Sequence, residues 1–178
     1  MATRKSLVLI VLMMVFAAPG LVAYLFFTHP QWLGAATTNR GVLLNPSIRF
    51  VKINDKEKWR LILWNPGACD KNCLEQLDKL ARIRLALGRH LYEVDQWLIT
   101  DETVELPASL LHLFKEEDIQ VRRLSQEEHS QFKILNAKSQ VFIANPDDYL
   151  ILTYAQDAKP DAIFHDIKHL LSVDKKNG

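Results

Sequence analysis

The chain has 178 residues, which is enough for one ordinary domain and a small additional segment. Its 22 basic and 21 acidic residues leave a formal net charge of +1, so composition gives no electrostatic reason to expect a nucleic-acid partner. The sequence contains no Gly-rich phosphate loop, nucleophile elbow or paired-carboxylate motif, and its internal pattern shows no repeat. These observations exclude a simple assignment as a nucleotide-binding protein, a serine hydrolase or a repeat protein.

The N-terminal segment predicts a membrane anchor. Arg4 and Lys5 are the only charged residues before position 40, and the run from residue 6 to residue 27 is uncharged. As a helix this run is roughly 33 Å long, which is enough to cross a hydrocarbon core of about 30 Å. A cleavable signal peptide is the alternative, with Ala17-Ala18 as a cleavage site. We favour an uncleaved anchor because the apolar run continues past that site.

Charge also predicts the orientation of the anchor. Two basic residues precede the segment and none follows it directly, so the positive-inside rule places residues 1–5 in the cytoplasm. The remainder would then lie outside, which is the periplasm if the membrane is a bacterial inner membrane. We expect a single-pass protein with a polar connector over 28–46, a folded domain over 47–174 and a short tail over 175–178.

Both cysteines of the chain lie just after a predicted buried strand. The stretch from Trp59 runs through an apolar segment into Asn65-Pro66-Gly67, after which a helix is expected to begin with Cys69 in its first turn. Cys73 follows four residues later, on the same helix face, so the two side chains can meet. A helix N-terminus stabilises a thiolate, which predicts that Cys69 is the more acidic thiol. Two thiolates also suit a soft ion such as Cu(I).

The remaining elements alternate between strands and helices. Leu61–Trp64 is expected to be a central strand, and the helix after Cys69 stops at Gly88. Further strands are expected over 48–51, 94–100 and 119–124, with a polar turn over 54–56, a short helix over 106–114 and a helical or loop stretch over 125–135. The turn Asn145-Pro146-Asp147-Asp148 joins 141–144 and 149–154 into a hairpin, and Pro160 opens the last helix. This order predicts an α/β sandwich with a mixed sheet.

A strand leading to a cysteine pair, a second strand-helix unit, a hairpin and a closing helix together resemble the thioredoxin fold. The chain is most similar to the Sco family of membrane-anchored cytochrome c oxidase assembly proteins. The shared features are the single anchor, the Cys-x-x-x-Cys spacing of Cys69 and Cys73, and the hairpin Val141-Phe-Ile-Ala-Asn-Pro-Asp-Asp148. Residues 37–44 and 67–70 also resemble small membrane proteins associated with bacterial cytochrome oxidase genes.

The resemblance implies a copper site made of two cysteines and one histidine, which delivers Cu(I) to the oxidase copper site or reduces its cysteines. Cys69 and Cys73 match the family pattern, but Ala137 occupies the position expected for the histidine. His129 is the nearest candidate upstream. Asp70 replaces a proline that often follows the first cysteine, and no proline precedes Val141. These departures favour action on one partner over general disulfide exchange.

We therefore expect a membrane-anchored thioredoxin-like protein that assists cytochrome c oxidase assembly, with an oxidase subunit or another assembly factor as its partner. Cys69 and Cys73 would either reduce the cysteines of that partner or bind Cu(I). The alternative is a non-catalytic binding module in which the two cysteines form a structural disulfide. Asp161, His165 and His169 lie on one face of the last helix at a spacing that can bind a metal ion. We favour the simpler interpretation that this face is exposed to solvent.

Overall fold

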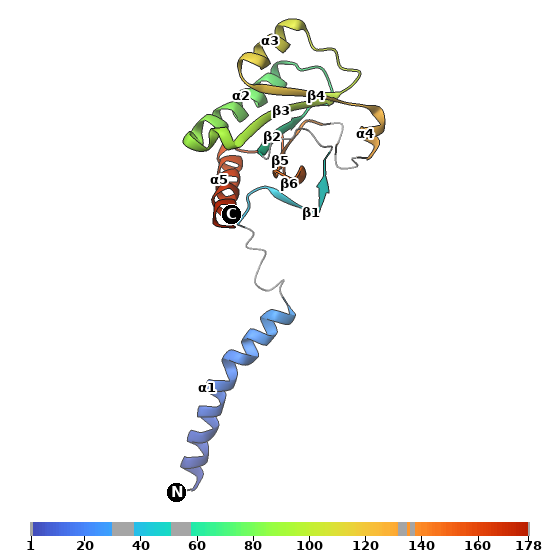
Figure 1. Ribbon diagram of the computed structural model, residues 1–178. Coiled ribbons are helices and arrows are strands. Elements are labelled where there is room, and N and C mark those ends of the chain that lie inside the picture. The colour runs from blue at the N-terminus through green and yellow to red at the C-terminus, as the bar shows by residue number, and fades with distance from the viewer. Residues whose placement is uncertain (1, 30–37, 51–57, 132–134, 136–137, 178) are drawn as a thin grey trace. The chain divides into compact units, whose positions relative to one another are not determined.

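The structure is a computed structural model that describes residues 2–29, 38–50, 58–131, 135 and 138–177 (Figure 1). The chain divides into two units, residues 1–38 and residues 39–178.

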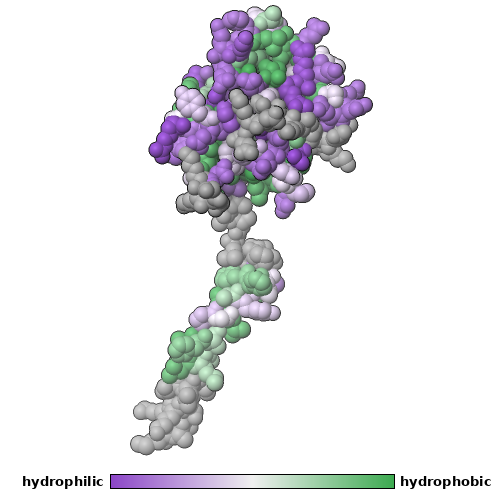
Figure 2. Space-filling view, in the orientation of Figure 1, coloured by the Kyte–Doolittle hydropathy of each residue, from purple (hydrophilic) through white to green (hydrophobic). Residues whose placement is uncertain are grey.

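The first unit contains one long helix, α1 (Ala2–Thr28), with Pro19 inside it. Its segment Val11–Thr28 is apolar and long enough to cross a membrane, and none of that segment is buried. Hydrophobic side chains accordingly form much of the described surface of this helix (Figure 2). The expected N-terminal apolar helix is thus confirmed as a candidate membrane span.

The second unit is built on a six-stranded mixed sheet with the order β1-β6-β5-β2-β3-β4 (Figure 1). Strands β2, β3 and β4 run parallel, whereas the pairs β2-β5, β5-β6 and β1-β6 are antiparallel. The strands are β1 (Val42–Arg49), β2 (Trp59–Trp64), β3 (Val94–Asp101), β4 (Ile119–Leu124), β5 (Gln140–Ala144) and β6 (Tyr149–Ala155). The helices are α2 (Lys71–Ala86), α3 (Ala108–Glu116), α4 (Gln126–Gln131), α5 (Pro160–Asn177) and the 3₁₀ helix η2 (Gly88–Glu93).

Strand β2 lies at the centre of the sheet and is buried on both faces. Leu61 and Leu63 belong to one hydrophobic cluster, and Ile62 and Trp64 belong to the other. Successive side chains of a strand point to opposite faces, so an apolar run without alternation is what a strand covered on both faces requires. The central position predicted for this segment is confirmed.

Helices cover one of the two faces. The cluster on that face joins the sheet to apolar side chains of α2, α3 and α5, and α2 lies against α5 (Figure 1). The cluster on the other face includes Phe50 and Leu135, with Leu44 and Ile48 of β1 packed against it. The expected mixed sheet flanked by helices is therefore present.

The predicted strands and helices from residue 59 onward are confirmed, with ends that shift by a few residues. Of the stretch expected over 125–135, α4 (Gln126–Gln131) is helical, and residues 132–134 lie outside the described residues. The main difference lies at the start of the unit. Strand β1 begins at Val42, so residues 42–46, which we assigned to the connector, belong to an edge strand that pairs with β6. The turn expected over 54–56 lies outside the described residues. At the other end, α5 continues to Asn177.

Candidate functional site

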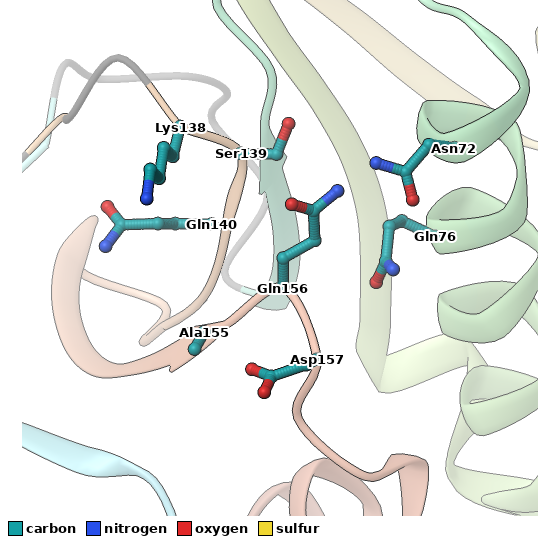
Figure 3. A pocket seen from close by; sticks show the side chains of 8 residues that line it. All are labelled: Asn72, Gln76, Lys138, Ser139, Gln140, Ala155, Gln156 and Asp157. Carbon is teal, nitrogen blue, oxygen red and sulfur yellow. The ribbon is translucent and has the colours of Figure 1, made fainter.

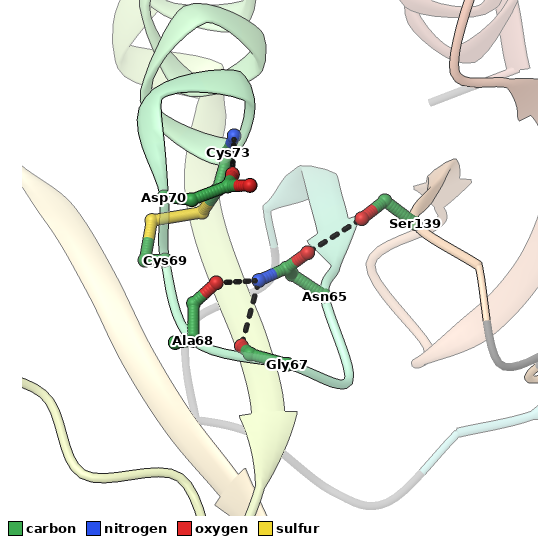
Figure 4. Close-up of a disulfide and its surroundings, with 7 residues drawn as sticks. All are labelled: Asn65, Gly67, Ala68, Cys69, Asp70, Cys73 and Ser139. Carbon is green, nitrogen blue, oxygen red and sulfur yellow. Dashed lines mark hydrogen bonds between the residues drawn. A yellow bond between two sulfur atoms is a disulfide. The ribbon is translucent and has the colours of Figure 1, made fainter.

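The loop between β2 and α2 is held by one buried asparagine. The backbone N–H of Asn65 donates to the Ile99 carbonyl of β3 at 2.9 Å. Its side-chain Nδ2 donates to the carbonyl oxygens of Gly67 at 2.8 Å and Ala68 at 3.2 Å (Figure 4). The Ser139 hydroxyl, just before β5, donates to Asn65 Oδ1. Asn65 thereby connects the cysteine loop to two neighbouring strands.

Cys69 and Cys73 form a disulfide, with their Cα atoms 5.0 Å apart (Figure 4). The two residues differ in exposure: Cys73 is only 2% exposed, and Cys69 is half-buried. Cys73 belongs to the hydrophobic cluster beneath α2, and Cys69 packs at its margin. A soluble reagent or a partner thiol would therefore reach Cys69 more readily.

The start of α2 differs from the expected one. Cys69 does not lie in the first turn, because Asp70 is the N-cap residue and the helix proper begins at Lys71. The Asp70 carboxylate accepts the backbone N–H of Cys73 at 3.0 Å. Aspartate is among the preferred N-cap residues, since its side chain accepts one of the N–H groups left unpaired at the start of a helix. Cys73, rather than Cys69, is thus the cysteine in the first helical turn.

His129, considered as a third copper ligand, contacts Asp101 and Trp64. His129, on α4, lies 2.9 Å from Asp101 at the end of β3, and its ring contacts the Trp64 ring edge at a centroid distance of 5.0 Å. Trp64 and Cys73 belong to clusters on opposite faces of the sheet. Ala137, at the position where the Sco pattern has histidine, lies outside the described residues. Among the described residues, no group of three His, Cys, Asp or Glu side chains is arranged to hold a metal ion.

The helical trio considered as a second metal site is also not assembled. Asp161 pairs with Arg40 at 3.5 Å, while His165 contacts Asp166 at 3.0 Å. Within the described part of the chain, His169 therefore completes no metal-binding group with them.

Asp166, on α5, is a buried carboxylate that accepts several hydrogen bonds. It is 1% exposed and accepts the backbone N–H groups of Arg40 at 2.9 Å and Gly41 at 2.8 Å. The Tyr154 hydroxyl of β6 donates to it at 2.7 Å. A Cβ atom at Gly41 would lie 2.5 Å from the Tyr154 ring, so the close approach of the chain here requires glycine. Asp166 thereby ties the start of the folded unit to α5 and β6.

These contacts shift two pKa values. Burial acts to raise the pKa of Asp166, but hydrogen bonds from His165, the Arg40 and Gly41 N–H groups and Tyr154 outweigh it and hold that pKa below its usual value. Burial, the hydrogen bond to Asp166 and its negative charge together raise the pKa of Tyr154. Asp166 is therefore ionised and Tyr154 neutral at physiological pH.

The sequence did not single out Asn65, Ser139 or Asp166 as site or framework residues. The Asn-Pro-Gly signal marked a turn at Asn65, but nothing local indicated its contact with Ser139, which is distant in sequence. The partners of Asp166 are equally distant. Asp70 did carry a local signal, since an aspartate directly before a helical pattern is a common N-cap.

The fold and the disulfide at the start of α2 define a thioredoxin-like protein. The chain belongs to the family described as transmembrane-like, thioredoxin-like, C-terminal domain, whose model matches residues 59–174, more than half of the chain. No curated protein matches the sequence significantly.

Solved structures agree on the fold. The copper-bound ScoI of Arabidopsis thaliana has a TM-score of 0.51 at 14% identity, covering 65% of this chain and 85% of that chain. A yeast mitochondrial 1-Cys peroxiredoxin, solved to study thiol resolution, has a TM-score of 0.50 at 14% identity, covering 68% of this chain and 67% of that chain. At such identity the likeness shows the fold alone.

Proposed function

We propose that this protein is a membrane-tethered thiol-disulfide exchange protein that acts on the cysteines of one partner through Cys69 and Cys73. The observation that best supports this proposal is the unequal exposure of the two cysteines that form the disulfide. Cys69 is half-buried and precedes α2, whereas Cys73 is buried in its first turn. An exchange pair needs one accessible cysteine to attack and one protected cysteine to resolve.

The proposed reaction starts from the reduced pair. The Cys69 thiolate attacks one sulfur of a partner disulfide, that S–S bond breaks, and the released partner thiolate takes up a proton. The Cys73 thiolate then attacks the Cys69 sulfur of the mixed disulfide, which releases the second partner thiol. The partner gains two electrons and two protons, and the Cys69–Cys73 disulfide remains. A separate dithiol reductant would restore the reduced pair.

The proposed partner is a cytochrome c oxidase subunit, or another assembly factor, whose cysteines must be reduced before copper insertion. The Sco-like spacing of Cys69 and Cys73 supports this partner. The charge pattern around α1 supports a single-pass arrangement with the folded unit on the periplasmic side of a bacterial inner membrane. Disulfide chemistry is favoured in that compartment.

Cu(I) as a transient cargo is a second candidate function. Two thiolates can bind Cu(I), and copper-bound ScoI shares the fold. Because the described residues bring no third ligand to the pair, we propose weak, exchangeable binding by the two sulfurs alone. A Cu(I) titration of the reduced full chain against a competing chelator, with Cys69→Ser as control, tests Cu(I) binding separately from thiol-disulfide exchange.

The exchange proposal is tested with glutathione disulfide and the reduced full chain in detergent. We expect the wild type to become intramolecularly oxidised and the Cys73→Ser variant to stop as a mixed disulfide on Cys69, both visible by intact-protein mass spectrometry. The Cys69→Ser variant should react much more slowly, since Cys73 is buried. Equal reactivity of the two single variants would overturn the assigned roles, and the absence of reaction in all three would favour a structural bridge.

A further inference from the structure

A hollow of about 440 Å³ lies on the surface of α5, next to the start of the folded unit. Its lining includes the side chains of Arg40, His165, Lys168 and His169, and Asp161 is the acidic residue among them. Guanidinium and ammonium groups carry only hydrogen-bond donors, and histidine rings add positive charge when protonated. This α5 hollow therefore has the chemistry of a site for an anionic group such as a phosphate.

The hollow beside the start of α2 has a different lining (Figure 3). Its volume is about 550 Å³, and uncharged side chains predominate in it. One base, Lys138, and one acid, Asp157, leave it with no excess charge. Charge thus distinguishes the α5 hollow, where Arg40 and Lys168 outnumber Asp161.

A buried carboxylate positions two of the residues that line the α5 hollow. Asp166 accepts the backbone N–H of Arg40 at 2.9 Å and lies 3.0 Å from Nδ1 of the His165 ring. Its oxygens also accept hydrogen bonds from Gly41 and Tyr154, so the charge of Asp166 is satisfied within the fold. The backbone of Arg40 and the ring of His165 are thereby in place before any ligand binds.

An aromatic ring positions the ammonium group of Lys168. Its Nζ atom lies 5.5 Å from the centroid of the Phe164 ring, which also lines the α5 hollow. The face of an aromatic ring attracts a cation within about 6 Å. The charge of Lys168 is therefore kept next to the hollow although the residue is exposed.

The carboxylate of Asp161 does not close the site. It pairs with Arg40 at 3.5 Å, but the two side chains are 87% and 50% exposed. Exposed ion pairs contribute little to stability, because water and salt screen them. A phosphate oxygen can therefore replace Asp161 as the partner of Arg40 with little loss of stability.

The position of the α5 hollow in the chain indicates which anion it meets. Only residues 29–39 separate the end of α1, a candidate membrane span, from Arg40. A segment of that length spans at most about 40 Å, so lipid headgroups at the membrane surface are within reach of Arg40. A tether also raises the effective concentration of its two ends, so that weak contacts become populated.

We propose that the α5 hollow binds the phosphate group of an anionic phospholipid, with Arg40 and Lys168 as its main ligands, in the membrane that holds α1. The bound lipid would keep the α5 side of the folded unit at the membrane surface. This inference goes beyond the exchange function, because it uses the membrane tether and no chemistry of Cys69 or Cys73.

The test uses the full chain in phospholipid nanodiscs, with a fluorophore attached through Val173→Cys while the Cys69–Cys73 disulfide stays intact. Val173 is exposed and adjacent in sequence to Ser172, which lines the hollow. A lipid with a nitroxide on its headgroup quenches the fluorophore at the membrane surface. Discs of phosphatidylcholine alone are compared with discs in which phosphatidylglycerol replaces part of it. The same label attached through Ser109→Cys, at an exposed position of α3, reports on another surface.

We expect phosphatidylglycerol to increase the quenching at residue 173 but not at residue 109. Lys168→Ala should lower the ratio of membrane-bound to unbound folded unit about fivefold, as expected for one basic residue at an anionic surface. The matched control Lys115→Ala, at an exposed lysine of α3, should leave this ratio unchanged. Asp161→Asn should raise the ratio about two- to fivefold, because it removes the competing carboxylate. Such a rise cannot result from a loss of folding.

Equal quenching in the two kinds of disc, or equal losses in Lys168→Ala and Lys115→Ala, would overturn the inference and leave the exchange function intact. Inorganic phosphate, added to the labelled full chain in detergent, tests the soluble form of the same ligand. A response to inorganic phosphate without a response to phosphatidylglycerol would overturn the assignment to a lipid. Failure of the chain to enter nanodiscs would instead overturn the membrane tether, and this inference with it.

Discussion

The cysteine loop depends on the orientation of one amide, that of Asn65. Its side chain is enclosed, with the residue 7% exposed, and makes two donor contacts to loop carbonyls and one acceptor contact to Ser139. Asn65→Asp keeps the shape but places a carboxylate oxygen against the carbonyl oxygens of Gly67 and Ala68. Asn65→Ala removes the group altogether.

The expected magnitudes follow from these contacts. A net contribution of about 1 kcal/mol per hydrogen bond, reduced by rehydration of the exposed Gly67 and Ala68, gives a loss of about 2 kcal/mol for Asn65→Ala. Asn65→Asp should cost about 3 kcal/mol at pH 7, because two acceptors then face a buried negative charge. The carbonyl oxygens of Gly67 and Ala68, together with burial, would raise the pKa of the introduced carboxyl group. Protonation of that group at lower pH should therefore stabilise the folded variant.

The assay is urea unfolding of the full chain in detergent, followed by tryptophan fluorescence between pH 4 and pH 8. The Asn65→Asp variant should recover about 1 kcal/mol or more as pH falls through the raised pKa. The control Asn72→Asp makes the same chemical change at an exposed position and should stay within about 0.5 kcal/mol of the wild type. Equal stability of Asn65→Asp and Asn65→Ala at pH 7, with no pH dependence, would refute the assigned amide orientation.

Three further outcomes are expected. Because folding lowers the pKa of Asp166, its contribution to stability is fully present above the unfolded-state pKa of about 4 and is lost as pH falls through the folded-state pKa. In urea unfolding, Asp166→Asn should be about 2 kcal/mol less stable than the wild type at pH 7, and its stability should depend less on pH below about pH 5. Asp70→Asn retains an N-cap but removes a negative charge beside the cysteines, so reduced Cys69 should react about two- to fivefold faster with iodoacetamide at pH 7, and an unchanged rate would contradict the electrostatic argument. Arg60 and Asp148 form a buried ion pair, so Arg60→Leu should cost about 3–5 kcal/mol, and adding Asp148→Asn should recover part of that loss in the same assay.

The central part of the fold could be predicted because its signals are local. The apolar run of β2, the Pro and Gly residues at the element boundaries and the helical spacing of α2 each depend on neighbours in sequence. The start of β1 could not be found in this way, because Val42 and Leu43 are exposed and are held by pairing with Thr153 and Leu152 of β6. Such a pairing is a long-range contact that no local pattern encodes.

The candidate site was predictable in part for the same reason. The spacing of Cys69 and Cys73 indicated that they can meet, and the structure joins them. The predicted start of α2 was too early, because Asp70 was not considered as the N-cap residue. His129 was considered from its position upstream of the hairpin, yet its neighbours, Asp101 and Trp64, come from the ends of two other strands.

A structural role for the bridge would have a limited effect on stability. The loop closed between Cys69 and Cys73 is short, with a sequence separation of 4. The chain-entropy model assigns such a loop only about 2 kcal/mol, at the lower end of the usual range for disulfides. Reduction of the pair is therefore expected to lower the free energy of unfolding by about 2 kcal/mol.

The reduction potential of the Cys69–Cys73 pair tests the central proposal most directly. It is measured by equilibrating the full chain in detergent with glutathione or dithiothreitol buffers and counting free thiols by alkylation and mass spectrometry. An exchange pair should have a potential of about −120 to −270 mV, the range of known thiol-disulfide exchange proteins. A potential below about −300 mV, typical of structural disulfides, would contradict the proposed function.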